Sequence, residues 1–245
     1  MQYLVLMRDI ELYGKKAIEL GITWTKNLSK MRYLIFSDVH SDIKAMNSLI
    51  EKTKHINCNK IISLGDNIGY GNFPDLVIDL LLNKQIFSIA GNHERSIIDK
   101  EELNALSEKA KEAIFENLKF LKSKHIQYIK KLPDFITENN IRFVHALPPK
   151  SYSVYINRLL KEEILQQTKL YSEQFVFCGH THTNGIYEIS NNKIKFIEPK
   201  FNKTYQLKSD KRYIINIGSL SGNRRTIKTF TLFDSQNNLL EFVNN

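Results

Sequence analysis

The chain has 245 residues, of which 42% are hydrophobic and 25% are charged, a balance typical of a globular protein. Ten glycines and five prolines are too few for a disordered or low-complexity chain, and two cysteines cannot form a disulfide framework. The sequence contains no apolar run of the ~20 residues that a transmembrane helix needs, and Asp9 and Glu11 interrupt any signal-peptide pattern. We therefore expect a cytoplasmic protein that does not enter a membrane.

The net charge is +9, and one segment holds most of the excess. Residues 193–228 contain ten basic side chains and two acidic ones, Glu198 and Asp210. Such a concentration of charge attracts phosphoesters, nucleic acid or acidic lipid headgroups, although lysines are also common on any solvated surface. The segment therefore favours an anionic partner without identifying it.

The pattern of apolar residues changes at Met31. Residues 1–30 predict a short strand and a helix but carry no recognisable chemistry, so we interpret them as an N-terminal extension. From Met31 onward, strands alternate with helices, which is typical of parallel strands in a sheet covered by helices. The expected elements are a strand over 33–36, a helix from Ser41 or Asp42, a strand over 60–64, a helix from Pro74 and a strand over 85–90.

The second half of the chain predicts further helices and strands. Residues 95–131 are expected to be mostly helical, strands are expected over 135–137 and 141–145, and a helix over about 153–170. From Phe175 onward, six short apolar segments alternate with turns, which predicts a run of antiparallel strands. We therefore expect residues 31–245 to form one α/β domain with parallel and antiparallel pairing.

Metal-binding side chains follow the predicted strands instead of being scattered along the chain. The carboxyl ends of strands line the binding crevice of an open α/β sheet, so these side chains are expected to converge. His55 and His125 fall within helical patterns, and we interpret them as surface or packing residues. The residues at the strand ends are Asp38, His40, Asp66, Asn92, His93, His145, His180 and His182.

The chemistry of this set favours particular metals. Mixed nitrogen and oxygen ligands suit Mn, Fe, Zn or Co better than Ca or Mg, and the lack of cysteine ligands argues against a structural zinc site. The Asp66 carboxylate has two oxygens and can bridge two cations. Seven ligands with one bridge fit two ions about 3.5–4 Å apart, the arrangement that stabilises an in-line phosphoryl displacement.

The segments DVH, GDNIGYG, GNHE, VHALP and GHTH resemble the five motif blocks of the calcineurin-like metallophosphoesterase superfamily. The form LGDxxGYG with a later IxxGS is most similar to its small bacterial and archaeal phosphodiesterase branch, over roughly residues 31–234. The resemblance implies a four-layer α/β/β/α sandwich of two mixed sheets, with a dinuclear metal site between them. It implies that Asp38, His40, Asp66 and His182 hold one metal, that Asp66, Asn92, His145 and His180 hold the other, and that His93 acts on the phosphoryl group.

The sequence also departs from relatives in the superfamily. Its protein Ser/Thr phosphatases carry GDxVDRG, whose Asp and Arg are replaced here by Gly69 and Tyr70, which argues against that branch. Ile217 stands where the small phosphodiesterases usually have a proline, and their following arginine aligns with Arg224, which we expect to contact substrate phosphate, with Arg225 as a substitute. We interpret Arg95 as a surface arginine in preference to a second phosphate contact, and Cys178 as a small buried hydrophobe. Tyr70 is expected either to stack on a base or to cover the loop.

The expected function is hydrolysis of phosphodiesters or phosphomonoesters through a metal-bridging hydroxide. The expected cofactors are two divalent transition-metal ions, with Mn first and Fe, Zn, Ni or Co as alternatives, and the expected substrate is a small phosphoester or a nucleotide-like one. A nuclease with the same chemistry is a second hypothesis, supported by the basic 193–228 segment but not by any aromatic stacking platform. A third is a non-catalytic metal-binding scaffold, against which the complete ligand set argues.

Overall fold

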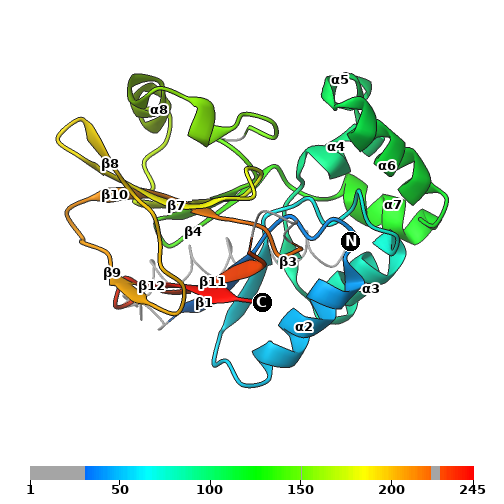
Figure 1. The fold of residues 1–245 in the computed structure, drawn as a ribbon, viewed down its shortest axis with the longest axis horizontal. Helices are drawn as coiled ribbons and strands as arrows, with labels where there is room; N and C mark the ends of the chain where they lie inside the picture. Colours follow the sequence, from blue (N-terminus) through cyan, green and yellow to red (C-terminus); the bar gives the residue numbers. More distant parts are fainter. Residues whose placement is uncertain (1–30, 150, 222–226) are drawn as a thin grey trace, which may run out of the picture. The chain divides into compact units, whose positions relative to one another are not determined.

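The computed structural model describes residues 31–149, 151–221 and 227–245, so the predicted extension, Arg224 and Arg225 lie outside the described residues. Within these ranges, twelve strands form two six-stranded mixed sheets (Figure 1). The first sheet has the order β3-β2-β1-β11-β12-β9 and the second the order β4-β5-β6-β10-β7-β8.

The first sheet consists of β1 (Arg32–Phe36), β2 (Lys60–Ser63), β3 (Phe87–Ser88), β9 (Thr204–Gln206), β11 (Thr229–Asp234) and β12 (Leu239–Asn244). The second sheet consists of β4 (Phe135–Glu138), β5 (Ile141–Val144), β6 (Phe175–Cys178), β7 (Asn184–Ser190), β8 (Lys193–Ile197) and β10 (Arg212–Ile217). The helices are α2 (Ile43–Thr53), α3 (Pro74–Asn83), α4 (Asn92–Ile98), α5 (Lys100–Ala105), α6 (Glu108–Leu118), α7 (Ser123–Lys130), the 3₁₀ turn Ile156–Arg158 and α8 (Lys161–Thr168).

Successive side chains of the central strands point to opposite faces of the sheet, and this alternation produces the layers of the fold. In β1, Tyr33 and Ile35 belong to the apolar cluster shared by the two sheets, whereas Leu34 and Phe36 pack with Met46 of α2 on the other face. This is the two-residue period of a strand that is buried on both faces. Helices α2 and α3 therefore cover the outer face of the first sheet.

The second sheet is buried in the same way. Phe175 and Phe177 of β6 belong to the cluster between the sheets, while Val176 and Cys178 pack with Ile164 of α8 on the outer face. The architecture is thus α/β/β/α, which confirms the expected four-layer sandwich of two mixed sheets. Cys178 is fully buried in the outer layer, as expected of a small hydrophobe.

The helix starts follow the capping signals in the sequence. Asp42 caps α2, because its Oδ1 accepts a hydrogen bond from the backbone N–H of Ala45 across 3.0 Å. Pro74 opens α3. His125 is a fully buried packing residue: its Nδ1 accepts from the backbone N–H of Lys122 across 3.0 Å at the start of α7.

Three expectations about the elements are wrong, and one strand was not expected. The strand expected over 85–90 is reduced to the two residues of β3, an edge strand paired on one side. The helix expected over 153–170 is split, because the extended backbone of Leu159 and Leu160 separates the 3₁₀ turn from α8. The segment FVFCG is not antiparallel: β6 pairs in parallel with β5 and β10, as its continuous apolar run permits. Strand β9 was not expected, since TYQ has little apolar character.

The parallel pairing gives the strands that carry the motifs a common direction. Strands β1, β2 and β3 are parallel in the first sheet, and β5 and β6 are parallel in the second. The motif residues follow the carboxyl ends of these five strands. Within the described ranges, none of the helices has the length and apolar character required to span a bilayer.

Candidate metal centre

The two sheets contribute side chains to one centre. Asp38 and His40 follow β1 and Asp66 follows β2, whereas His145 and His180 follow β5 and β6. A hydrogen bond crosses between the sheets here, because the backbone N–H of His180 donates to Oδ2 of Asp38 across 3.0 Å. The predicted site residues therefore converge, as their positions at strand ends indicated.

The backbone at this centre is unusual. Five of the predicted ligands have left-handed backbone conformations, with φ between +50° and +64°. Residues other than glycine seldom adopt this region, which costs energy and tends to occur at functional sites. The five are Asp38, His40, Asp66, His180 and His182.

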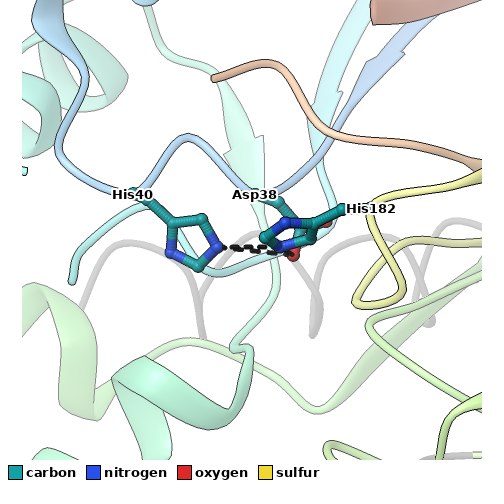
Figure 2. A group of neighbouring side chains, drawn as sticks. All are labelled: Asp38, His40 and His182. Carbon is teal, nitrogen blue, oxygen red and sulfur yellow. Dashed lines mark hydrogen bonds and ion pairs between the residues drawn. The ribbon is translucent and has the colours of Figure 1, made fainter. Parts of the chain in front are cut away.

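One group of side chains surrounds the first candidate metal position. Figure 2 shows the rings of His40 and His182 converging on the carboxylate of Asp38. The two Nε2 atoms lie 2.9 Å apart, and Oδ1 of Asp38 lies 3.1 Å from Nε2 of His182 and 3.8 Å from Nε2 of His40. Two imidazole nitrogens and one carboxylate oxygen therefore point to the same small space, as ligands of one cation would.

A second group surrounds Oδ1 of Asn92. This atom lies 3.1 Å from Nε2 of His145, 3.1 Å from Nδ1 of His180 and 3.2 Å from Oδ2 of Asp66. The alternative amide orientation would place the Asn92 nitrogen here and let it donate to the same atoms. With the oxygen in this place, Asn92 adds an amide oxygen to two imidazole nitrogens and one carboxylate oxygen, a donor set that fits a divalent transition metal.

Asp66 links the two groups. Its carboxylate oxygens belong both to a set with His145 and His180 and to a set with His40 and His93. The atoms within each set lie within 4.8 Å of one another. A carboxylate in this place can contact two cations, which is the bridging role that the sequence predicted for it.

Hydrogen bonds on the far side of three rings select the nitrogen that faces the centre. Nδ1 of His40 lies 3.2 Å from the carbonyl oxygen of Ile68, and Nδ1 of His145 lies 2.8 Å from that of Leu64. In His180 the order is reversed, with Nε2 bonded to a backbone carbonyl and Nδ1 facing Asn92. An N–H that donates to a carbonyl leaves the other nitrogen free as a ligand, and orients the ring.

The electrostatics of the centre favour the neutral form in two of these three rings. Burial, and then His93, lower the pKa of His40 to about 3, and burial, and then His145, lower the pKa of His180 to about 4. Both rings are therefore neutral near pH 7, the form that binds metal. Burial lowers the pKa of His145 as well, but the Asp66 carboxylate outweighs this effect and raises it to about 9.

His93 lies beside the ligand groups, at the start of α4. Its Nε2 is 3.8 Å from Oδ2 of Asp66, and its backbone N–H donates to Oδ1 of Asp66 across 3.0 Å. The ring packs directly on Gly69, where an added Cβ would lie only 2.0 Å from Nδ1. The φ of Gly69 is +94°, so this position requires glycine both for conformation and for space.

Two buried residues that sequence reasoning did not single out support the centre. The carboxylate of Glu94 accepts from the backbone N–H groups of Asp66, Asn67 and Gly91 across 2.7–2.9 Å. Asn117 of α6 accepts from the N–H of Gly69 across 2.7 Å and donates to the carbonyl of Gly71 across 2.9 Å. Glu94 was visible within GNHE, but no sequence signal marks Asn117, which reaches the centre only through the packing of α6.

The remaining predictions have different outcomes. Arg95 is more buried than expected: its side chain is 16% exposed, pairs with Asp134 and donates to the carbonyl of Leu132 across 2.8 Å. Tyr70 is half-exposed and packs edge-on against His40, with ring centroids 4.9 Å apart. Arg224, the predicted phosphate contact, lies outside the described residues.

A cavity of about 310 Å³ gives access to the centre. Ligand residues from both groups line it, together with His93 and the rings of Tyr70 and Tyr155. The ring of Tyr155 packs on His180, with centroids 4.2 Å apart. The cavity is therefore large enough for a small anion at the metal centre and has aromatic side chains at its border.

Comparisons with known proteins identify chains and structures that are similar to this one. An uncharacterised protein of Methanocaldococcus jannaschii is 28% identical over 220 residues, covering 87% of each chain. The crystal structure of a metallophosphoesterase from Sphaerobacter thermophilus matches with a TM-score of 0.73 and 24% identity, over 89% of this chain and 88% of that one. A protein from Pyrococcus horikoshii OT3 matches with a TM-score of 0.64 and 15% identity, over 87% of both chains.

These two structures have the same fold as this chain. The sequence match to a family is more specific: residues 31–238 match the calcineurin-like phosphoesterase superfamily domain, which confirms the resemblance found in the motifs. The chain therefore belongs to the calcineurin-like phosphoesterase superfamily.

Proposed function

We propose that this protein is a two-metal hydrolase of small or nucleotide-like phosphoesters. The observation that carries the proposal is the pair of ligand groups joined by Asp66, built from strand ends of both sheets. Metal-dependent hydrolysis of phosphoesters is the chemistry of the superfamily. The seven side chains offer the oxygen and nitrogen donors that this chemistry needs, at one end of a rigid sandwich.

In this proposal Asp38, His40 and His182 would hold one cation, Asn92, His145 and His180 would hold the other, and Asp66 would serve as a ligand of both. Mn is the first candidate, with Fe, Zn, Ni and Co as alternatives, because the donor set mixes imidazole with carboxylate and amide oxygen. When bound, two such cations supply neutralisation of the phosphoester charge and a water nucleophile that is activated near neutral pH.

The chain's own residues then orient the ligands and move a proton. Backbone carbonyls fix the rings of His40, His145 and His180, so the ligand geometry exists before substrate arrives. His93 lines the same cavity without such a carbonyl partner among the described residues. We assign to it the donation of a hydrogen bond or proton from Nε2 to the phosphoryl or leaving-group oxygen.

The loop after β2 favours the phosphodiesterase branch over the protein phosphatases. Tyr70 occupies the position at which those phosphatases carry their phosphate-binding arginine, and its ring packs on His40 and His93, with centroids 4.9 and 5.0 Å away. A tyrosine in this place offers an aromatic ring in place of the guanidinium that binds phosphate in those phosphatases. We infer a preference for small substrates, with phosphodiesters ahead of phosphomonoesters.

The nuclease hypothesis rests on the basic 193–228 segment, and three of its ten cations are already engaged. Lys211 pairs with Glu188 across 2.5 Å, Lys228 pairs with Asp42 across 2.8 Å, and the Arg212 guanidinium donates to three backbone carbonyls. The segment therefore gives less support to nucleic-acid binding than its composition indicated. The scaffold hypothesis is not favoured either, because the predicted ligand set is complete in the sequence and its side chains lie in groups that could hold metal. Two free cysteines agree with a cytoplasmic location.

The decisive experiment strips the full chain of metal, reloads it separately with Mn, Ni, Zn or Mg, and assays each form on phosphomonoesters, phosphodiesters, cyclic nucleotides and oligonucleotides. We expect no turnover without metal, full turnover at two Mn per chain, and the highest rate on small diesters. An Asp66→Asn variant is the matched control, because it removes the bridge and should abolish turnover with every metal. Full turnover in verified absence of metal would contradict the proposal, and a steep salt dependence on oligonucleotides alone would favour the nuclease.

A further inference from the structure

A second, larger cavity adjoins the metal centre. Its volume is about 660 Å³, within the range of ~300–1,000 Å³ that small-molecule sites occupy. It shares His40, Tyr70 and His182 with the metal cavity, so the two spaces meet at these side chains. A substrate bound at the metals can therefore extend its other end into this side cavity.

Two aromatic rings form the walls of the side cavity. Tyr70 is 46% exposed and Phe73 is 45% exposed, and both line it. Asn117 fixes the backbone on either side of Tyr70 through its hydrogen bonds to Gly69 and Gly71. The ring of Tyr70 is thus held beside the metal centre, and the pair offers flat apolar surface to a planar group.

The same cavity is positively charged. Lys44 and Lys109 line it, both are exposed, and neither forms an ion pair with another described residue. Nζ of Lys109 lies 6.0 Å from the centroid of the Tyr70 ring. Asp42, the one acidic side chain among the described lining residues, already pairs with Lys228 and caps α2. An anionic group beside a planar one would be neutralised here.

We propose that the side cavity binds a nucleoside that is joined to the scissile phosphate and carries a further phosphate. The base would stack on Phe73 and Tyr70, and Lys109 and Lys44 would bind the phosphate that is not hydrolysed. This inference rests on the proposed function, because it places the scissile phosphate at the metal centre. It makes Phe73 and Lys109 specificity residues that do not take part in the chemical step.

The first test measures binding, which does not require turnover. Adenosine 3′,5′-bisphosphate and adenosine 5′-monophosphate are titrated calorimetrically into the metal-loaded full chain. We expect Phe73→Ala to weaken both ligands about tenfold, the lower part of the range for a base stacked on an aromatic ring. Phe73→Leu keeps an apolar side chain at the start of α3 but lacks the flat ring, so it should weaken the binding of both ligands by nearly the same factor.

Lys109→Ala should weaken the bisphosphate about two- to fivefold and leave the monophosphate nearly unchanged, as expected for one exposed ion pair. Two variants of α6, the helix that carries Lys109, serve as matched controls. Phe115→Ala removes an exposed ring within this helix, and Lys119→Ala removes an exposed cation at its C-terminal end. Neither residue lines the cavity. Equal weakening by test and control variants, or no binding of either nucleotide, would overturn the inference.

The second test uses two diesters with the same leaving group, the p-nitrophenyl esters of thymidine 5′-phosphate and of methyl phosphate. We expect Phe73→Ala to raise KM for the thymidine ester about tenfold, with kcat unchanged, and to leave the methyl ester unaffected. Hydrolysis of both esters without a nucleoside preference would overturn the side-cavity inference alone. Hydrolysis of neither ester would instead contradict the proposed function, and tighter, salt-sensitive binding of oligonucleotides would assign the cavity to a polymer.

Discussion

The backbone N–H of Asp66 donates a hydrogen bond to the Glu94 carboxylate across 2.9 Å, so one buried carboxyl group holds another in place. The same carboxylate accepts from the N–H groups of Asn67 and Gly91. Glu94 therefore ties the loop after β2 to the start of α4. It sets the distance between Asp66 and Asn92, two of the proposed ligands of one metal.

We predict that Glu94→Gln weakens both stability and metal binding. Both carboxylate oxygens accept backbone hydrogen bonds, and the glutamine amide would turn one acceptor into a donor that faces N–H groups. A buried donor left without a partner costs about 1–3 kcal/mol in the free energy of unfolding. Chemical denaturation and metal content measure the two effects. Glu112→Gln, on the exposed face of α6, is the control and should change neither.

Gly69→Ala should lower turnover through His93. The new Cβ would lie 2.0 Å from Nδ1 of the His93 ring, at a φ of +94° that alanine seldom adopts. We expect the ring to shift and the rate to fall at least tenfold while two metals stay bound. Gly185→Ala is the comparison, because its Cβ meets the half-exposed ring of Phe196, which can move. Wild-type turnover in the Gly69 variant would show that the position of His93 is not critical.

The sequence was most informative where apolar strands end in polar residues. Asp38 and Asp66 follow runs that are buried on both faces, and parallel strands bring such ends to one edge of a sheet. That is why the converging ligands and the layered fold could both be predicted. The left-handed conformations of Asp38 and His180 add to this geometry, but no pattern in the sequence predicts them.

The supporting residues could not be predicted because they act across the fold. Asn117 is one polar residue in an amphipathic helix, and its contacts with Gly69 and Gly71 arise only when α6 packs over the loop. The environment of Arg95 was misjudged for the same reason, since its partner Asp134 is distant in the sequence. The parallel direction of β6 depends on its neighbours β5 and β10, which the local pattern of FVFC does not specify.

A chain that begins at Met31 should fold and hydrolyse phosphoesters at the rate of the full chain. All proposed ligands and the described apolar clusters lie within residues 31–245, and β1 begins at Arg32. Thermal unfolding, metal content and turnover of the shortened chain check this expectation. If the shortened chain folds and binds two metals but is inactive, residues 1–30 take part in the reaction and the proposed division of the chain is wrong.

The sharpest prediction separates Asn92 from its neighbour His93. Oδ1 of Asn92 faces the ligand nitrogens of His145 and His180, whereas Nε2 of His93 is 3.8 Å from Oδ2 of Asp66. Asn92→Ala should therefore weaken the second metal, so its activity should partly recover at high metal concentration. His93→Ala should keep both metals and a near-normal KM, while kcat falls about 10²–10⁴-fold, the usual contribution of a general acid.

Metal content and rate must be measured together on both variants, because His93 also belongs to a group with His40 and Asp66 that could hold an ion. His93→Gln gives a second variant that can still donate a hydrogen bond but cannot carry a proton. It should recover part of the lost rate on a good leaving group and little on a poor one, because only a poor leaving group needs the proton. Stoichiometric loss of metal in His93→Ala, or wild-type turnover on a poor leaving group, would show that His93 is not the proton donor.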